Sequence, residues 1–115
     1  MTDPAMAPVQ LVLCTTPVHR AADIARALVE RRLAACVNVV PSVRSIYTWN
    51  EAVCEEEESL LIAKTTGDRA VALREAILSM HPYDVPEVLV LDIDEAAGHE
   101  PYLAWVRQCV TVRNH

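Results

Sequence analysis

The apolar residues of the chain follow two different periods, and the change between them marks the predicted elements. The first run, Val9–Thr16, is short, continuous and rich in Val and Leu, which is typical of a buried strand. From His19 to Ala35 the apolar residues recur at helical spacing, at Ile24 and Leu28 for example, with Arg and Glu between them. That spacing predicts an amphipathic helix with one face turned to the core.

The middle of the chain is predicted to form a long β-hairpin. Its arms are Cys36–Asn50 and Glu51–Thr66, and Pro41 in the first arm indicates a bulge or an edge position. Each arm reaches ~45–50 Å at roughly 3.3 Å per residue, whereas a domain of this length is about 35 Å across. We therefore expect the hairpin either to bend at Pro41 or to protrude and pair with another subunit of a homo-oligomer.

The C-terminal half is predicted to add a helix (Gly67–Met80), an apolar strand at the centre of the sheet (Val88–Asp94) and a last short helix (Pro101–Val110). The order β-α-β-β-α-β followed by a helix is the plan of ferredoxin-like domains. We therefore predict an α+β sandwich, with two helices on one face of an antiparallel sheet. It forms one domain over residues 9–115, behind a flexible leader formed by residues 1–8.

Charge and composition exclude several classes of function. The net charge is −6 and the basic residues are scattered, which argues against a nucleic-acid or anionic-membrane surface because both need clustered Lys and Arg. No apolar stretch approaches the ~18 residues of a membrane span. The sequence contains no phosphate-binding Gly motif and no evident nucleophile–base pair, so it gives no indication of an enzyme. The four Cys form no C-x-x-C pair and the chain shows no signal peptide, so we expect free thiols in the cytoplasm.

Five motifs of the chain are distinctive enough to suggest a family. They are, in chain order, VLCTTP, LAACVNVVPSVRSIYTW, EEEESLLIAKTT, HPYDVPEVLVL and YLAWV. Together they resemble the CutA divalent-cation tolerance proteins, over a stretch that runs from about Val9 to Val110. The resemblance implies a cytoplasmic homotrimer whose ferredoxin-like protomer is akin to the P-II signalling proteins. It also implies a role in tolerance of divalent metal ions, with copper as a bound ion.

The same resemblance implies a copper site. The family's ligands are the Cys of the LCT motif and the His residues before Pro-Tyr, which correspond here to Cys14, Met80 and His81, with Met80 in place of a His. Thiolate, thioether and imidazole suit Cu(I), although the ends of the first strand and second helix need not lie close together. The competing interpretation is that Cys14 is a buried thiol and that His81 caps the helix end, where a cation is favourable.

The hairpin tip and the run of glutamates are the next features of interest. Many family members have Gly in a W-x-G turn, whereas this chain has Trp49, Asn50 and Glu51; Asn accepts positive φ. Of the four carboxylates in Glu55–Glu58, at most two can face one side of a strand. We therefore expect a solvated edge or pairing with Arg at a trimer interface, because a hard-ion site would need further oxygen ligands.

The loop HPYDVPE is the remaining candidate for ligand contacts, because Pro82 and Pro86 hold it extended. Side chains of this loop and of the hairpin tip are expected to line a cleft between subunits, namely Tyr83, Asp84, Glu87, Tyr47 and Trp49. The alternative is that the aromatic residues only bury apolar area between subunits. A ligand in such a cleft would make the chain a P-II-like regulatory or scaffolding trimer. The other histidines are expected at the surface: His19, His99 and His115.

Overall fold

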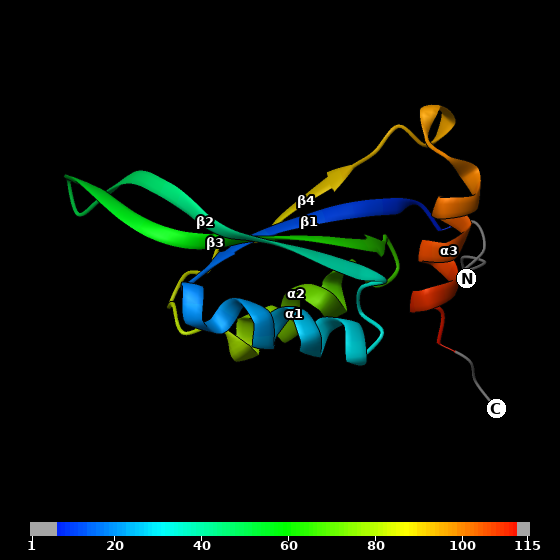
Figure 1. Cartoon of the computed structure of the whole chain (residues 1–115), viewed down its shortest axis with the longest axis horizontal. Coiled ribbons are helices and arrows are strands. Elements are labelled where there is room, and N and C mark those ends of the chain that lie inside the picture. Colours follow the sequence, from blue (N-terminus) through cyan, green and yellow to red (C-terminus); the bar gives the residue numbers. More distant parts are fainter. Residues whose placement is uncertain (1–6, 113–115) are drawn as a thin grey trace.

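The structure is a computed structural model that describes residues 7–112 of the chain (Figure 1). The elements within these residues are β1 (Val9–Thr16), η2 (Val18–Arg20), α1 (Ala21–Glu30), β2 (Cys36–Trp49), β3 (Ala52–Thr66), α2 (Ala70–Met80), β4 (Leu89–Asp92), η3 (Glu95–Ala97) and α3 (Glu100–Val110). The predicted β-α-β-β-α-β order with a C-terminal helix is confirmed. Residues 1–6 of the expected leader and His115 lie outside the described residues.

The four strands form one antiparallel sheet in the order β2-β3-β1-β4. The register of β1 against β3 runs without interruption from Val9↔Thr66 to Thr16↔Ser59. Figure 1 shows α1 and α2 together on one face of the sheet, while α3 lies at the end where β1 begins. This is the predicted ferredoxin-like α+β sandwich.

The core lies between the sheet and the two helices and is aliphatic. Leu28 of α1, together with Leu73 and Ile77 of α2, has no exposed surface, and these side chains pack on Val12 and Leu61 of the central strands. Burial of each such side chain stabilises the fold by roughly 1.5–3 kcal/mol before entropy is counted. A second cluster joins α3 to the start of β1, through Val9, Leu103, Val106 and Val110.

The first helix is shorter than the hydrophobic spacing predicts, because it ends at Glu30 and not at Ala35. Arg32 has a φ of 56° and starts a turn in which the Arg32 N–H donates to Val29 O and the Leu33 N–H donates to Leu28 O. This is the Schellman arrangement that ends many helices. Leu33 still lies in the core, in the same cluster as Leu28. Its apolar character therefore fits the helical spacing although the helix has already ended.

The last strand also differs from expectation. β4 spans only Leu89–Asp92 and pairs with β1 at the edge of the sheet, so its prediction as a central strand is wrong for the single chain. Asp94 ends the extended segment, because its side chain accepts a hydrogen bond from Ala96 N and starts η3. The apolar residues of β4 are exposed, with Leu89 54% and Leu91 42% accessible. The apolar character of these residues therefore does not indicate that the strand lies at the centre of the sheet.

The hairpin of β2 and β3 extends beyond the helical layer, as its length predicts (Figure 1). The chain measures 48 × 33 × 24 Å along its principal axes. The predicted bulge at Pro41 is confirmed, because the register shifts between Val40↔Leu60 and Val43↔Glu58, with one extra residue in β2. The hydroxyl of Ser59 donates to the Pro41 carbonyl at 2.8 Å and holds this irregularity in place.

The face of the sheet opposite α1 and α2 carries no helix over its middle within residues 7–112 (Figure 1). It is largely apolar, although Lys64 and Asn38 also lie on it. Cross-strand pairs show which residues share it, since Leu13 lies between Ile62 and Leu89 in the ladder, and Leu11 lies opposite Leu91. We call this surface the open sheet face and define it by Leu11, Leu13, Leu60, Ile62, Leu89 and Leu91. All six are partly or fully exposed.

Candidate functional site

The outer part of the hairpin presents one face of alternating residues to the loop that follows α2. In this region Ser45 pairs with Glu56, and Tyr47 pairs with Cys54. Because successive side chains of a strand point to opposite faces, Trp49 and Tyr47 share their face with Glu56 and not with its neighbours in the sequence. The expectation that only alternate glutamates of the run can converge is therefore confirmed.

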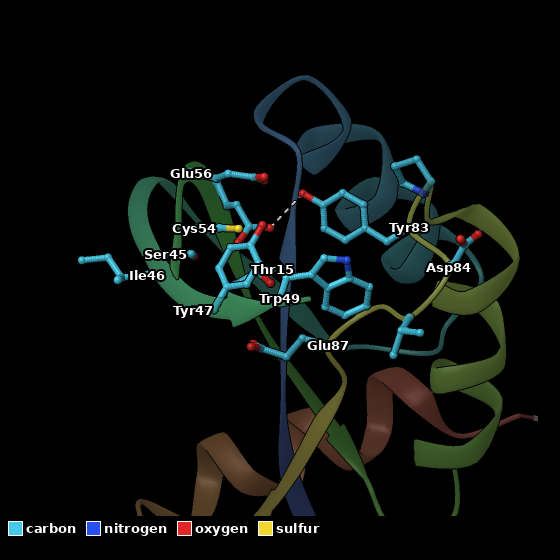
Figure 2. A pocket seen from close by; sticks show the side chains of 13 residues that line it. Thr15, Ser45, Ile46, Tyr47, Trp49, Cys54, Glu56, Tyr83, Asp84 and Glu87 are labelled. Carbon is cyan, nitrogen blue, oxygen red and sulfur yellow. Dashed lines mark hydrogen bonds between the residues drawn. The ribbon is translucent and has the colours of Figure 1, made fainter. Parts of the chain in front are cut away.

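The loop of residues 82–87 closes the other side of this region. The hydroxyl of Tyr83 donates a hydrogen bond of 2.9 Å to Oε2 of Glu58 (Figure 2). Glu58 is only 6% exposed, although it follows three exposed glutamates. The loop is thus fastened to the hairpin through a buried carboxylate.

A cleft of about 790 Å³ lies between the hairpin face and the loop. Figure 2 shows Tyr47, Trp49 and Glu56 reaching it from the hairpin, and Tyr83, Asp84 and Glu87 from the loop. The complete lining is Thr15, Ser45, Ile46, Tyr47, Trp49, Cys54, Glu56, Glu58, Pro82, Tyr83, Asp84, Val85 and Glu87. The five residues predicted for a cleft do line one, but a single chain supplies all of them. No Lys, Arg or His is among the lining residues.

The carboxylates of the cleft keep its tyrosines protonated. Burial, the hydrogen bond to Glu58 and the nearby negative charges raise the pKa of Tyr83 to about 12. The hydrogen bond to Glu56, followed by burial and the charge of that carboxylate, raises the pKa of Tyr47 to about 12. The Tyr83 hydroxyl therefore stays a hydrogen-bond donor to its carboxylate.

His81 is the C-cap residue of α2, and its ring joins the loop to β1. Its backbone N–H donates to Ile77 O, as in a helix end. Nδ1 accepts a hydrogen bond from the Tyr83 backbone N–H at 3.2 Å, so Nε2 carries the proton and donates to Thr15 O at 2.7 Å. The ring also packs against the Tyr83 ring, with centroids 4.6 Å apart. Both ring nitrogens thus have protein partners, and the ring does not bind the helix carbonyls.

Cys14 is a buried thiol on the helix-covered face of β1. It is 1% exposed, and burial, with further effects of Glu87 and Glu58, raises the pKa of its thiol to about 12. Met80 is partly buried and packs against the cluster that contains Cys14, while its carbonyl accepts from Arg20 at 2.8 Å.

The structure therefore brings the three residues of the predicted copper site to one end of β1. Cys14 precedes Thr15, whose carbonyl holds His81, and Met80 precedes His81. As arranged, they do not fit a copper ion, because a metal ligand needs a thiolate and a free imidazole nitrogen. Among residues 7–112, no group of three or more His, Cys, Asp and Glu side chains is placed to hold a metal ion.

The remaining candidates lie at the surface. Glu55, on the face away from the cleft, forms an exposed ion pair with Arg44 of the same hairpin at 3.4 Å. The expected pairing of the glutamate run with Arg at a trimer interface stays a prediction. His19 and His99 are exposed, as expected. None of the helices in the described part of the chain is long and apolar enough to cross a membrane.

Sequence reasoning missed the role of Glu58 and Thr15. The signal for Glu58 was its position, since it is the last glutamate of the run, is followed directly by the buried Ser59 and lies two residues from Glu56. The contact of Thr15 uses a backbone carbonyl, which no residue pattern reveals.

Comparison with known proteins agrees with this geometry. The profile of the CutA1 divalent ion tolerance protein family matches residues 10–109. The divalent-cation tolerance protein CutA of Thermus thermophilus is 48% identical over 100 residues, which cover 86% of this chain and 95% of that protein. Human protein CutA is 45% identical over 101 residues, which cover 87% of this chain but only 55% of the human protein.

Solved structures share the fold. The PII-like protein CutA from Nostoc sp. PCC 7120, in its apo form, superposes with a TM-score of 0.86 at 34% identity, covering 90% of this chain and 99% of that one. A periplasmic divalent cation tolerance protein CutA from Archaeoglobus fulgidus reaches 0.84 at 28% identity, with the same coverage of both chains. The family is one of tolerance proteins and not of enzymes. The chain described here belongs to the CutA1 divalent ion tolerance protein family.

Proposed function

We propose that this chain acts as a cytoplasmic homotrimer in the tolerance of divalent metal ions. The family to which it belongs supports the role in tolerance. The observation that carries the assembly is the open sheet face, whose six apolar residues are left uncovered by the chain's own helices. Contiguous exposed apolar surface of this kind marks an interaction site.

Two features at the rim of this face favour other copies of the chain as the occupant. β4 is an edge strand with exposed Leu and Val side chains and unpaired backbone groups on its outer side. The projecting hairpin of the same chain offers strand edges beyond its own helical layer. Copies that pair these edges would cover both at once, and three such copies would close into a ring.

Sedimentation equilibrium of matched variants tests the assembly. We expect the wild-type chain to have the mass of three chains, and Leu91→Glu, on the open sheet face, to have the mass of one. Val71→Glu is the control, because it introduces the same charge at a residue of α2 that is 60% exposed. A wild-type protein that stays folded as single subunits would contradict the proposal.

Growth of a strain lacking its own member of the family tests the role in tolerance. We expect plasmid-borne wild-type chain and Val71→Glu to restore growth in the presence of excess copper or zinc salts. Leu91→Glu is expected to restore less if the trimer is the active form. Equal growth with and without the wild-type gene would contradict the role, whatever the assembly state. Fractionation of the same cells tests the cytoplasmic location.

Copper binding through Cys14, Met80 and His81 stays a prediction. Their shared position at the end of β1 supports it, whereas the protonated thiol and the two occupied nitrogens of His81 require the site to rearrange first. Titration of Cu(I) into the wild type and into the double variant Cys14→Ala/His81→Ala tests it. Equal affinities would remove these residues from the site.

The second candidate is a P-II-like regulatory trimer that binds a small molecule. The cleft of about 790 Å³ favours it, because its volume is within the range of small-molecule sites. The Nostoc relative is described as PII-like. Two measurements on untagged purified protein distinguish the two candidates. The first candidate predicts bound metal, whereas the second predicts ligand-induced thermal shifts in metal-free protein.

A further inference from the structure

The cleft between the hairpin face and the loop of residues 82–87 has the chemistry of a cation site. We propose that it binds a small organic ammonium ion, whose N–H groups donate to Glu56 and Glu58 and whose apolar part lies on the aromatic rings of the cleft. This inference names a ligand class for the second candidate function above. It depends neither on copper binding nor on the role in metal tolerance.

The buried carboxylate of Glu58 is the first observation behind the proposal. It is 6% exposed, and within residues 7–112 the Tyr83 hydroxyl is its one hydrogen-bond partner and no Lys or Arg lies within ion-pair distance. An ionised carboxylate accepts about four hydrogen bonds. A buried charge with one neutral partner is costly unless a cation compensates it. A ligand that brings both N–H donors and a positive charge meets this need.

The aromatic lining is the second, independent observation. Tyr47 and Trp49 reach the cleft from β2, and Tyr83 reaches it from the opposite loop (Figure 2). Trp49 is 57% exposed and Tyr83 is 37% exposed, so ring surface is available to a ligand. Faces of Trp and Tyr attract cations through their ring quadrupole and also cover apolar carbon. Aromatic rings beside carboxylates are therefore suited to an organic cation more than to a bare one.

The sign of the charge selects against anionic ligands such as compounds that carry phosphates. Four carboxylates line the cleft, from Glu56, Glu58, Asp84 and Glu87, and no basic side chain does. The potential in such a cleft repels anions and concentrates cations. A bare divalent ion is not favoured, because no group of three or more ligating side chains converges among the described residues.

Calorimetric titration with benzylamine tests the proposal, and benzyl alcohol and ATP are the comparison ligands. The protein is the full chain, dialysed against EDTA. We expect benzylamine to bind with an affinity that falls as salt is added, since the attraction is screened. We expect benzyl alcohol and ATP to bind at least tenfold more weakly. Absence of benzylamine binding, equal binding of the alcohol, or binding that requires added metal would each overturn the proposal.

Three single substitutions locate the binding. Glu56→Gln and Glu57→Gln remove the same charge from neighbouring positions on opposite faces of β3, and only Glu56 lines the cleft. We expect Glu56→Gln to weaken benzylamine binding about tenfold, as loss of a charge-assisted hydrogen bond does, and Glu57→Gln to leave it within about twofold, as expected of a screened surface charge. Trp49→Leu is expected to weaken it about threefold to tenfold.

The outcomes separate this proposal from the others. Equal losses in Glu56→Gln and Glu57→Gln would mean general charge attraction and would overturn the cleft as the site. Glu56 is exposed, so its variant does not depend on a buried position for folding. A failure of benzylamine to bind leaves the sedimentation and growth results above unchanged. Loss of metal tolerance, with benzylamine binding retained, leaves this proposal standing.

Discussion

Tyr83 and Glu58, which are 25 positions apart in the sequence, are joined by a hydrogen bond of 2.9 Å from the phenol to the carboxylate. The same loop residue donates its backbone N–H to His81, whose ring in turn holds the carbonyl of Thr15. One continuous set of hydrogen bonds therefore joins β1, the end of α2 and the hairpin. The position of the loop depends on this set, and so does the shape of the cleft.

Removal of the Tyr83 hydroxyl is expected to destabilise the protein. In Tyr83→Phe the buried carboxylate of Glu58 loses its hydrogen-bond donor, which costs about 1–3 kcal/mol of unfolding free energy. Urea denaturation measures this loss. Tyr102→Phe is the control, because Tyr102 lies on α3, is 42% exposed and has a hydroxyl that makes no hydrogen bond within the described residues. Equal stabilities of the two variants would contradict the role of the bond.

Alkaline pH is expected to act on the same contact. The pKa of Tyr83 rises from 10.0 to about 12 on folding, so the fold favours the protonated phenol. This stabilisation is complete below pH 10, the ordinary pKa, and is lost as the pH rises towards 12. We expect tyrosinate absorbance from two of the three tyrosines, Tyr83 and Tyr47, to develop near pH 12. Tyr83→Phe should remove one of these late transitions, and an unchanged titration curve would contradict the assignment.

Cys14 is expected to resist alkylation in the folded protein. The thiolate is the reactive form, and burial raises the pKa of this thiol to about 12 while leaving only 1% of the residue exposed. Cys54, which lines the cleft and is partly exposed, serves as the internal reference. Mass spectrometry after brief iodoacetamide treatment should show modified Cys54 and unmodified Cys14, with both modified in urea. Similar rates for the two residues in the folded protein would contradict the prediction.

The hairpin tip offers a stabilising substitution. Asn50 and Glu51 have φ angles of 51° and 66°, which identifies a turn that favours glycine at its second position. Glu51→Gly relieves the left-handed strain of a side chain and is expected to stabilise the protein by about 0.5–1 kcal/mol. Ala52→Gly, one residue further and at the start of β3, should instead destabilise it by a similar amount. Thermal unfolding of the two variants checks the opposite signs.

The sequence alone predicted what depends on local periodicity. Val9–Thr16 is a strand with the bounds expected from its apolar run, and the bulge follows from Pro41, which lacks a backbone N–H. The alternation along β3 correctly divided Glu55 from Glu56. Tyr47 and Trp49 were expected in a cleft because they lie near the tip of a long hairpin, and they are there.

What the sequence could not predict depends on contacts between distant segments. Leu33 is apolar and buried, so spacing extended α1 through it, although the left-handed Arg32 had already ended the helix. β4 is an edge strand with exposed apolar side chains, and no local pattern distinguishes such a strand from a central one. Glu58 is buried because Tyr83 reaches it from another segment, and no local rule distinguishes it from the exposed glutamates before it.

The extra residue of β2 near Pro41 decides which chemistry the cleft contains. Beyond the shift, Ser45 and Tyr47 lie opposite Glu56 and Cys54, with side chains on the cleft side. If the ladder ran on from Val40↔Leu60 without the extra residue, Arg44 would lie opposite Glu56 and Ile46 opposite Cys54 in their place, because a one-residue slip exchanges the two faces of a strand. The shift near Pro41 thus gives the cleft an aromatic, anionic wall where an unshifted register would leave a basic, aliphatic one, so relatives that differ in this register could differ in ligand preference while keeping the same fold.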